Sequence, residues 1–296
     1  MTTAAPALRA LFHAARHGAD LAPHEATLQA ASGELPLLMA ALRQQAEHAN
    51  AQVYDQPAAF EAFIRGGGNV PLYQRVSAEL ASHYEGVRSL LDVGCGDGEA
   101  LFPALAARQH GQKGLERLTL VEPAIPLLAK AKGRARVEQP DVRMRALNEG
   151  LGDFAARLTP DEHWDLAQAT FALQAIPEAE RWEGLARLRA HVDRLVIVEF
   201  DIPVLEHGSD GLLLSLAGRY ERALGEYDGD VRELVAQGFL LPMFLGQLDE
   251  QTAATNWEHP AAVWRERLEQ QGWRVRKLER LYDYFWSPAF VLVADA

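Results

Sequence analysis

The sequence predicts an α/β fold in which helices precede a doubly wound, mainly parallel sheet. From Ser89 onward, short apolar runs alternate with helical stretches, and this alternation is typical of parallel sheets with helices on both faces. Before Ser89, apolar residues recur at helical spacing instead. The alternation stops between residues 203 and 260. We therefore expect an N-terminal helical cap over 1–88, an α/β domain over 89–296, and an insertion lid over 203–260.

The elements follow from local signals in chain order. A first helix is predicted around Leu8–Ala15, and a second begins at Pro36, since proline loses no hydrogen bond in a first helical turn. Three glycines, Gly66–Gly68, then break the chain, and Asn69 is a good cap for a helix over 70–84. Strands are predicted at 90–93, 118–122, 142–146, 165–169, 195–200, 273–282 and 289–294, with helices at 99–108, 125–136, 179–190, 212–223, 230–237 and 261–271.

Composition narrows the classes of function. The chain has 296 residues and a net charge of -12, which disfavours a nucleic-acid partner because binding to phosphates normally needs a basic face. No apolar run approaches the roughly 18 residues of a membrane span, and no leader is evident. Cys95 is the only cysteine, which excludes an internal disulfide and a cysteine-rich metal site. We expect a cytoplasmic protein without a metal or a membrane partner.

The segment Leu90–Glu99 carries the chemistry. An apolar strand runs into a turn with three glycines and then into a helix, so a ligand can approach the main chain closely. Dinucleotide enzymes place a third glycine where this chain has Glu99. Asp92 before the turn and Asp97 within it suit a cationic ligand, such as one with a sulfonium and an amino group, better than a pyrophosphate.

The segment Asp92–Gly98 (DVGCGDG) resembles the first motif of the class I S-adenosylmethionine-dependent methyltransferases. The resemblance covers about residues 85–205 and the last two strands. It implies a Rossmann-like, seven-stranded sheet of order 3-2-1-4-5-7-6 and S-adenosylmethionine as the cofactor. It also implies cofactor contacts from the residues of the turn and of the motifs that follow it: Asp92, Gly94, Cys95, Gly96, Glu122, Pro123, Asn148, Gln168, Ala169 and Tyr73.

Two of these implied roles have a plain chemical reason. Glu122 ends the second strand, where the family has an acid for the ribose, because a carboxylate accepts hydrogen bonds from two neighbouring hydroxyls. Asn148 stands where the family usually has an acid that meets the adenine amino group. It either accepts that hydrogen bond or merely forms a turn. The backbone of Gln168 and Ala169 is expected to border the cofactor.

The acceptor side rests on the same resemblance. Ligands bind beyond the carboxyl ends of the strands, so Glu199 and Asp201 are candidates to hold the acceptor or take its proton, with loop anchoring as the alternative for Glu199. Tyr54 resembles a tyrosine that the family places near the sulfonium. Four side chains are candidates for contacts with the substrate: Phe171, Gln174, Tyr284 and Trp286.

The function implied is in-line transfer of a methyl group to a small-molecule metabolite by a monomer or homodimer. Three alternatives stay open at this point. They are a catalytically inactive partner subunit of the same fold, methylation of a protein acceptor, and a nicotinamide oxidoreductase, which Asp97 and Glu99 disfavour.

Overall fold

The computed structural model describes residues 4–17, 19–32, 35–47, 57–108, 114–206, 208–247 and 256–296. The chain divides into two compact units. The first, here called the helical unit, comprises Met1–Val70, Val204–Ala253 and Tyr284–Trp286. The second, the sheet unit, comprises Pro71–Pro203, Ala254–Asp283 and Ser287–Ala296. The N-terminal helices and the insertion, which the sequence analysis treated separately, therefore belong to one unit.

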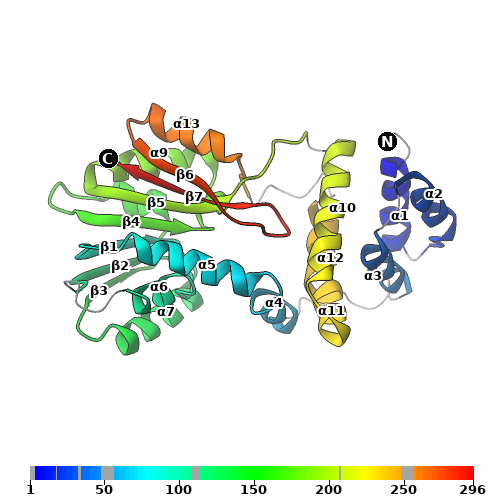
Figure 1. Cartoon of the computed structure of the whole chain (residues 1–296), viewed down its shortest axis with the longest axis horizontal. Helices are drawn as coiled ribbons and strands as arrows, with labels where there is room; N and C mark the ends of the chain where they lie inside the picture. Colours follow the sequence, from blue (N-terminus) through cyan, green and yellow to red (C-terminus); the bar gives the residue numbers. More distant parts are fainter. Residues whose placement is uncertain are drawn as a thin grey trace. The chain divides into compact units, whose positions relative to one another are not determined.

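The sheet unit contains one seven-stranded sheet of order β3-β2-β1-β4-β5-β7-β6, as the resemblance implied (Figure 1). The strands β1 to β5 run parallel to one another, and β7 pairs antiparallel with both β5 and β6. Their bounds are β1 Ser89–Val93, β2 Arg117–Val121, β3 Arg143–Leu147, β4 Trp164–Thr170, β5 Val192–Phe200, β6 Arg274–Tyr282 and β7 Ala289–Asp295.

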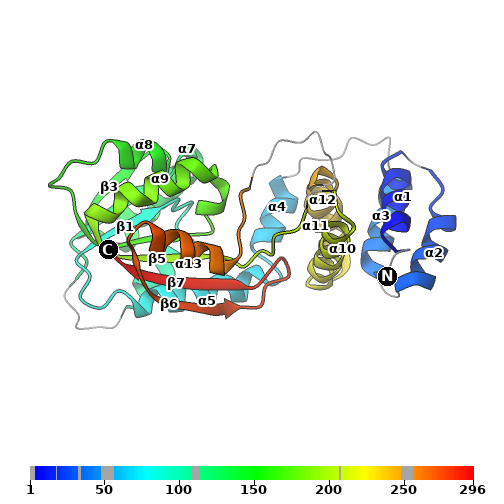
Figure 2. The same ribbon diagram turned by 90° about the horizontal axis from the view of Figure 1, so that it is seen from above.

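Helices flank this sheet (Figure 2). They are α5 Asn69–Ser82, α6 Leu101–Ala106, α7 Ile125–Glu138, α8 Leu151–Ala156, α9 Glu178–Leu188 and α13 Ala261–Gln270, with short 3₁₀ turns η1 Leu173–Ala175 and η2 Arg189–His191. The sequence analysis missed α8, because six residues are too few for a helical period to stand out. No helix in the described part of the chain is long and apolar enough to cross a membrane.

The main core of the sheet unit lies between the sheet and the helices α8, α9 and α13. Its large side chains include Phe154 of α8 and Trp264 of α13, which pack against strand residues such as Trp164 and Leu292. These four side chains are at most 4% exposed. Burial of this kind, at roughly 25 cal/mol per Å² of apolar surface, holds the strands in register and so sets where each strand ends.

The helical unit contains the helices α1 Ala4–His17, α2 Ala22–Ser32, α3 Pro36–Glu47, α4 Pro57–Ile64, α10 Asp210–Gly225, α11 Gly229–Val235 and α12 Leu241–Gln247, with a π-helical turn η3 Ala236–Leu240. Within this unit, Phe244 of α12 packs against both the N-terminal helices and the rest of the insertion. Its ring lies 4.7 Å from that of Phe12 and 4.3 Å from that of Tyr220, centroid to centroid. The role of the insertion as a lid stays a prediction.

The triple glycine receives side chains from the insertion. A Cβ atom on Gly66 or Gly67 would lie within 2.9 Å of the Tyr227 ring, and one on Gly68 would lie 2.6 Å from Glu226 Oε1. The N–H of Gly68 donates to Glu226 Oε2 at 2.8 Å. These glycines therefore do more than break a helix, since they allow the N-terminal segment and the insertion to pack closely.

Gly67→Ala is expected to lower the free energy of unfolding by about 2–4 kcal/mol. The φ angle of Gly67 is +49°, and an added Cβ would lie 2.8 Å from Tyr227 Cζ. Strain in the left-handed region and overpacking therefore add. Gly229→Ala is the matched control, because its φ is +53° and nothing lies within 4 Å. We expect a loss of about 1 kcal/mol there. Urea denaturation measures both, and equal losses would contradict the packing role.

Candidate functional site

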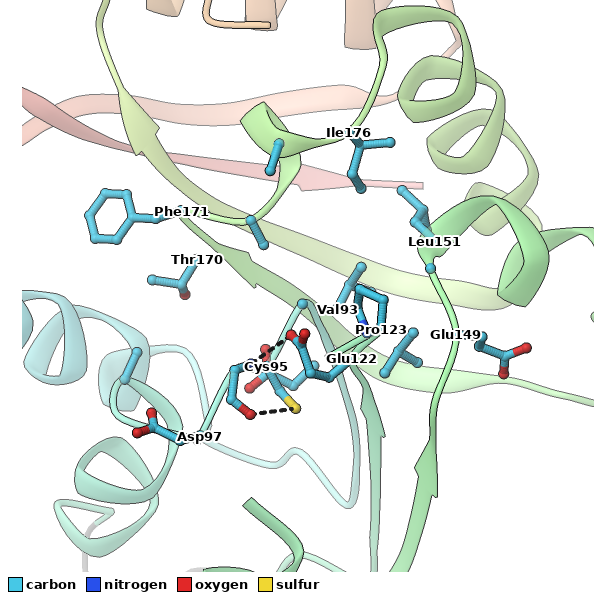
Figure 3. A pocket seen from close by; sticks show the side chains of 18 of the residues that line it. Val93, Cys95, Asp97, Glu122, Pro123, Glu149, Leu151, Thr170, Phe171 and Ile176 are labelled. Atoms are coloured by element: carbon cyan, nitrogen blue, oxygen red, sulfur yellow. Dashed lines mark hydrogen bonds between the residues drawn. The ribbon is translucent and has the colours of Figure 1, made fainter. Parts of the chain in front are cut away.

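A cavity of about 500 Å³ opens in the sheet unit where β1, β2 and β4 end (Figure 3). Val93, Val121 and Thr170, the last residues of these strands, all line it. In doubly wound sheets this edge is where ligands bind. The cavity is therefore the candidate site, and its other lining residues are Tyr73, Asp92, Gly94–Asp97, Glu99, Ala100, Glu122, Pro123, Glu149–Leu151, Phe171, Ala172, Ala175–Pro177 and Glu180.

Two glycines of the turn after β1 are required by close packing. Gly94 has a φ of +67°, and a Cβ atom there would lie 2.3 Å from Ala172 Cβ. Gly98 has a φ of +82°, and its added Cβ would lie 2.2 Å from the Phe102 ring. A larger residue at Gly94 would collide with Ala172, and one at Gly98 would collide with Phe102 of α6. Gly94 itself lines the cavity, whereas Gly98 does not.

Gly96 differs from the other two. Its φ is +55°, but a Cβ atom there would meet nothing within 4 Å, because the residue lines the cavity. Its neighbour Cys95 also lines the cavity, and its Sγ donates to the Gly96 carbonyl at 3.6 Å. Burial raises the pKa of the Cys95 thiol, which keeps it protonated and unsuited to act as a nucleophile.

Glu122 links the two sides of the cavity. It is 7% exposed, and each oxygen already accepts one hydrogen bond, Oε2 from the Gly96 N–H at 3.0 Å and Oε1 from the Ala124 N–H at 2.8 Å. A carboxylate oxygen can accept two hydrogen bonds. Both oxygens therefore keep capacity for a pair of ligand hydroxyls, while the backbone bonds hold the carboxylate still.

Asp92 lies beneath the turn, opposite Gln168 of β4. It is 3% exposed. Burial, together with the charge of Glu122, raises the pKa of Asp92 to about 7. The Gln168 side chain is also buried, and the Tyr84 hydroxyl donates to its Oε1 at 2.6 Å. The carboxyl group of Asp92 is therefore only partly ionised at neutral pH.

Asp92→Asn is expected to make stability less dependent on pH. The folded pKa, about 7, lies above the usual 3.8, so the protonated carboxyl favours folding. That stabilisation is fully present below the usual value and is lost as the pH rises through about 7, by up to about 1.4 kcal/mol per pH unit. The amide does not ionise and escapes this loss. Urea denaturation at pH 5 and pH 8 measures it, and an identical pH shift in both proteins would contradict the prediction.

The cavity is rich in carboxyl groups. Six of its lining residues are acidic, namely Asp92, Asp97, Glu99, Glu122, Glu149 and Glu180. No arginine, lysine or histidine appears among the lining residues that the structure describes. A pyrophosphate would find neither a counter-ion nor a neutral environment here, whereas a cationic ligand is favoured.

Asn148 was expected to meet the adenine amino group of the ligand. Asn148 does not line the cavity. Its amide nitrogen donates to the carbonyls of Glu122 at 3.1 Å and Pro123 at 2.7 Å, and so it shapes the loop after β2. Glu149 lines the cavity instead and pairs with Arg157. The register of a loop residue depends on where β3 ends, which a local pattern does not determine.

The residues at the end of β4 that line the cavity also differ from the expected ones by one or two positions. Gln168 and Ala169 are expected to border the ligand, but both lie within the sheet, because β4 continues to Thr170. Thr170 and Phe171 line the cavity in their place. The Thr170 hydroxyl is buried and has no hydrogen-bond partner in the described part of the chain. It is therefore free to bond to a ligand.

Phe171 lines the cavity as expected and has an unusual backbone. Its φ is +50°, and it is the only non-glycine residue with a positive φ in the described ranges. Its N–H donates to the Val198 carbonyl at 2.9 Å, and its ring stacks on Phe200 at 4.4 Å with an interplanar angle of 11°. Tyr73 meets the Phe171 ring edge-on at 6.0 Å. A strained residue held by this many contacts is a common sign of a functional position.

Glu199, a candidate for contact with the acceptor, is absent from the lining of the cavity. It is 1% exposed, and Oε1 accepts hydrogen bonds from the N–H groups of Leu173 at 2.8 Å and Gln174 at 3.2 Å. Burial raises the pKa of Glu199 to about 8. Gln174 does not line the cavity either. Glu199 therefore supports η1 from behind, which is the loop-anchoring alternative.

Asp201 has a structural position as well. Its Oδ1 accepts from the N–H of Ala261, the first residue of α13, at 2.8 Å. Its carbonyl accepts from Ser287 Oγ at 2.6 Å. Asp201 thus ties the end of β5 to α13 and to the start of β7, and it is absent from the lining of the cavity.

The remaining candidates are not placed at this cavity. Tyr54 lies outside the described residues. Tyr284 and Trp286 belong to the helical unit, where the Tyr284 hydroxyl donates to Asn69 Oδ1 at 2.7 Å and Trp286 lies under the Arg219 guanidinium at 4.7 Å. Their contact with a substrate stays a prediction.

Comparisons with known proteins complete the description. No family model and no curated protein matches the sequence. Among solved structures, magnesium protoporphyrin IX methyltransferase (ChlM) from Synechocystis PCC 6803 with bound SAH is 16% identical, with a TM-score of 0.51, over 80% of this chain and 93% of that one. The mitomycin 7-O-methyltransferase MmcR is 17% identical, with a TM-score of 0.48, over 98% of this chain and 67% of that one.

Proposed function

We propose that this chain, which has the fold of the class I methyltransferases, binds S-adenosylmethionine and transfers its methyl group to a small molecule. The observation that carries the proposal is the cavity itself. It places an open glycine, Gly96, and a fixed carboxylate, Glu122, on one ligand site without any lysine, arginine or histidine among its described lining residues.

The residues fit this donor one by one. Glu122 has acceptor capacity for the two ribose hydroxyls, and Pro123 lies beside it. Glu149 is suited to accept from the adenine amino group, and the apolar side chains of Leu151 and Ile176 also line the cavity. The Thr170 hydroxyl, which is buried and has no partner among the described residues, is available to the methionine part of the donor.

The chemistry asks little of the protein beyond binding and alignment. The bound donor supplies a methyl group already activated by its sulfonium. The chain's residues hold the donor still and limit access of water, and alignment of two bound reactants lowers the barrier by several kcal/mol. Tyr73 and Phe171 form an aromatic wall at one end of the cavity, and aromatic faces attract a neighbouring cation.

A small acceptor suits the charge and the enclosure of the site. The chain carries a net charge of -12, which disfavours nucleic acid. The cavity of about 500 Å³ lies in the range of small-molecule sites. A protein acceptor or a non-catalytic role would need features outside this cavity.

Calorimetric titration of the full chain with S-adenosylhomocysteine, with NADH as the control ligand, tests the proposal. We expect a dissociation constant in the micromolar range for the first ligand and no measurable heat for NADH, because the carboxyl-rich lining repels a pyrophosphate. Binding of NADH alone would favour an oxidoreductase. Binding of neither ligand by a folded sample would overturn the proposal and favour the inactive partner subunit.

A further inference from the structure

The cavity has two chemically different ends. In Figure 3, Glu149 and Leu151 lie at one end, and Asp97, Thr170 and Phe171 lie at the other. The second end also has the Tyr73 side chain, which meets Phe171 edge-on. It therefore combines an aromatic wall with a carboxylate.

The acidic residues of the lining differ in whether they have an ion-pair partner. Glu149 is paired with Arg157, and Glu99 lies 3.4 Å from Arg134. Asp97 lines the cavity but makes no ion pair with any residue that the structure describes. The aromatic end therefore keeps an uncompensated negative charge that points to a cation as its ligand.

The donor alone does not balance this charge. S-adenosylmethionine carries a sulfonium, an ammonium and a carboxylate, so its net charge is about one positive unit. Asp97, Glu122 and Glu180 face the cavity without an ion-pair partner among the described residues. Even with Asp92 protonated, an excess of negative charge remains with the donor in place. A second cationic group beside the aromatic wall would be stabilised by this excess.

The pKa of Tyr73 reflects the negative charge at the aromatic end of the cavity. Burial raises its pKa to about 12, and the charges of Asp97, Glu99 and Glu199 act in the same direction. A phenolic acceptor in the same place would experience the same field and would resist ionisation. The site therefore disfavours the phenolate form that would attack as an oxygen nucleophile.

We propose that the acceptor is an arylalkylamine, with its nitrogen held near Asp97 and its ring against Phe171 and Tyr73. This inference rests on the proposed function and specifies its substrate class. The amine binds as its ammonium form and passes one proton to a carboxylate or to water before it reacts. Its nitrogen lone pair then forms the N–C bond as the S–C bond breaks, and the S–C electron pair stays on sulfur.

The charge balance of this step favours an amine over a phenolate. During the transfer the positive charge moves from sulfur to nitrogen, so the cavity holds the same net charge before and after. A phenolate would have to enter an already negative site, and its reaction would remove the only positive charge on the reacting atoms. Carboxylates held in fixed positions stabilise the positive charge throughout transfer to an amine and oppose the entry of a phenolate.

Binding of matched probes to the full chain saturated with S-adenosylhomocysteine tests the inference. The probes are phenethylamine, the neutral 2-phenylethanol and the phenol 4-ethylphenol, each titrated by calorimetry. We expect phenethylamine to bind at least about tenfold more tightly than either neutral probe, as one nearby carboxylate in a partly buried site can provide. Asp97→Asn should remove most of that preference. Glu183→Gln is the control, since Glu183 pairs with Arg187 on the surface of α9 and should leave it unchanged.

The outcomes separate the two proposals. Equal or tighter binding of the alcohol or the phenol, no measurable binding of the amine, or an undiminished preference in Asp97→Asn would overturn the amine acceptor and leave the proposed function standing. Failure of S-adenosylhomocysteine to bind would overturn the proposed function itself. Tyramine, which carries both groups, adds a second measurement with labelled donor: a methyl on nitrogen supports the inference, and a methyl on oxygen contradicts it.

Discussion

Gly96→Val is expected to weaken the binding of S-adenosylhomocysteine at least about 100-fold, equivalent to about 2.7 kcal/mol, while the protein stays folded. A Cβ atom there would meet no atom of the described residues within 4 Å, so the first atom of the added side chain fits without moving the protein. The side chain would occupy the cavity beside Glu122, whose Oε2 accepts from the Gly96 N–H. Calorimetric titration measures the loss, and circular dichroism checks the fold.

Gly86→Val is the matched control for this variant. Gly86 has a φ of +74°, an added Cβ there would also meet nothing within 4 Å, and the residue does not line the cavity. Both substitutions carry the cost of a left-handed conformation, about 1–2 kcal/mol. Only the change at Gly96 should affect binding. Ligand affinity at the wild-type level in Gly96→Val would show that the turn is not the binding site.

Arg181→Ala is expected to lower the free energy of unfolding by about 3–5 kcal/mol, in the range of changes from a large buried side chain to alanine in a core. Arg181 is fully buried, and its guanidinium lies over the rings of Trp182 at 4.8 Å and Trp264 at 4.7 Å. Its Nη1 donates to the carbonyls of Leu173 and Trp257. The alanine would leave both carbonyls unpaired and a void between two indole rings.

Arg187→Ala, on the same helix, is the control for Arg181→Ala. Arg187 is half-exposed and pairs with Glu183 at the surface, so its loss should change stability by no more than about 0.5 kcal/mol. Urea denaturation of both variants gives the comparison. Because Leu173 begins η1, which contributes to the cavity wall, Arg181→Ala should also weaken ligand binding. A stability loss below 1 kcal/mol would contradict the role of Arg181 in the core.

The turn after β1 shows what could be predicted from the sequence. Gly94, Gly96 and Asp92 are neighbours along the chain, and the local pattern already requires positive φ angles and a close approach of a ligand. Glu122 was assigned through the resemblance, and the hydrogen bond that it accepts from the Gly96 N–H places it beside the turn. The strand order followed the resemblance and is confirmed.

For residues farther from the motif, the expected positions and the lining of the cavity differ for an identifiable reason. Asn148 was expected where Glu149 lies, and Gln168 with Ala169 where Thr170 and Phe171 lie. A shift of one or two residues at a strand end depends on pairing with neighbouring strands, and β4 pairs with β5 up to Thr170. Nothing in the local sequence states that pairing, and a slip of one residue turns each side chain to the other face.

The alternation of strands and helices and the glycine turn could be predicted from the sequence, because they depend on residues close together along the chain. The resemblance added the acid that follows β2. Only the tertiary structure decided that Glu199 supports η1 instead of facing the cavity, that Gly66–Gly68 receives Tyr227 and Glu226, and that the insertion joins the N-terminal helices in one unit. Each of these depends on contacts between residues far apart in sequence, whose partners are chosen by packing and burial rather than by local pattern.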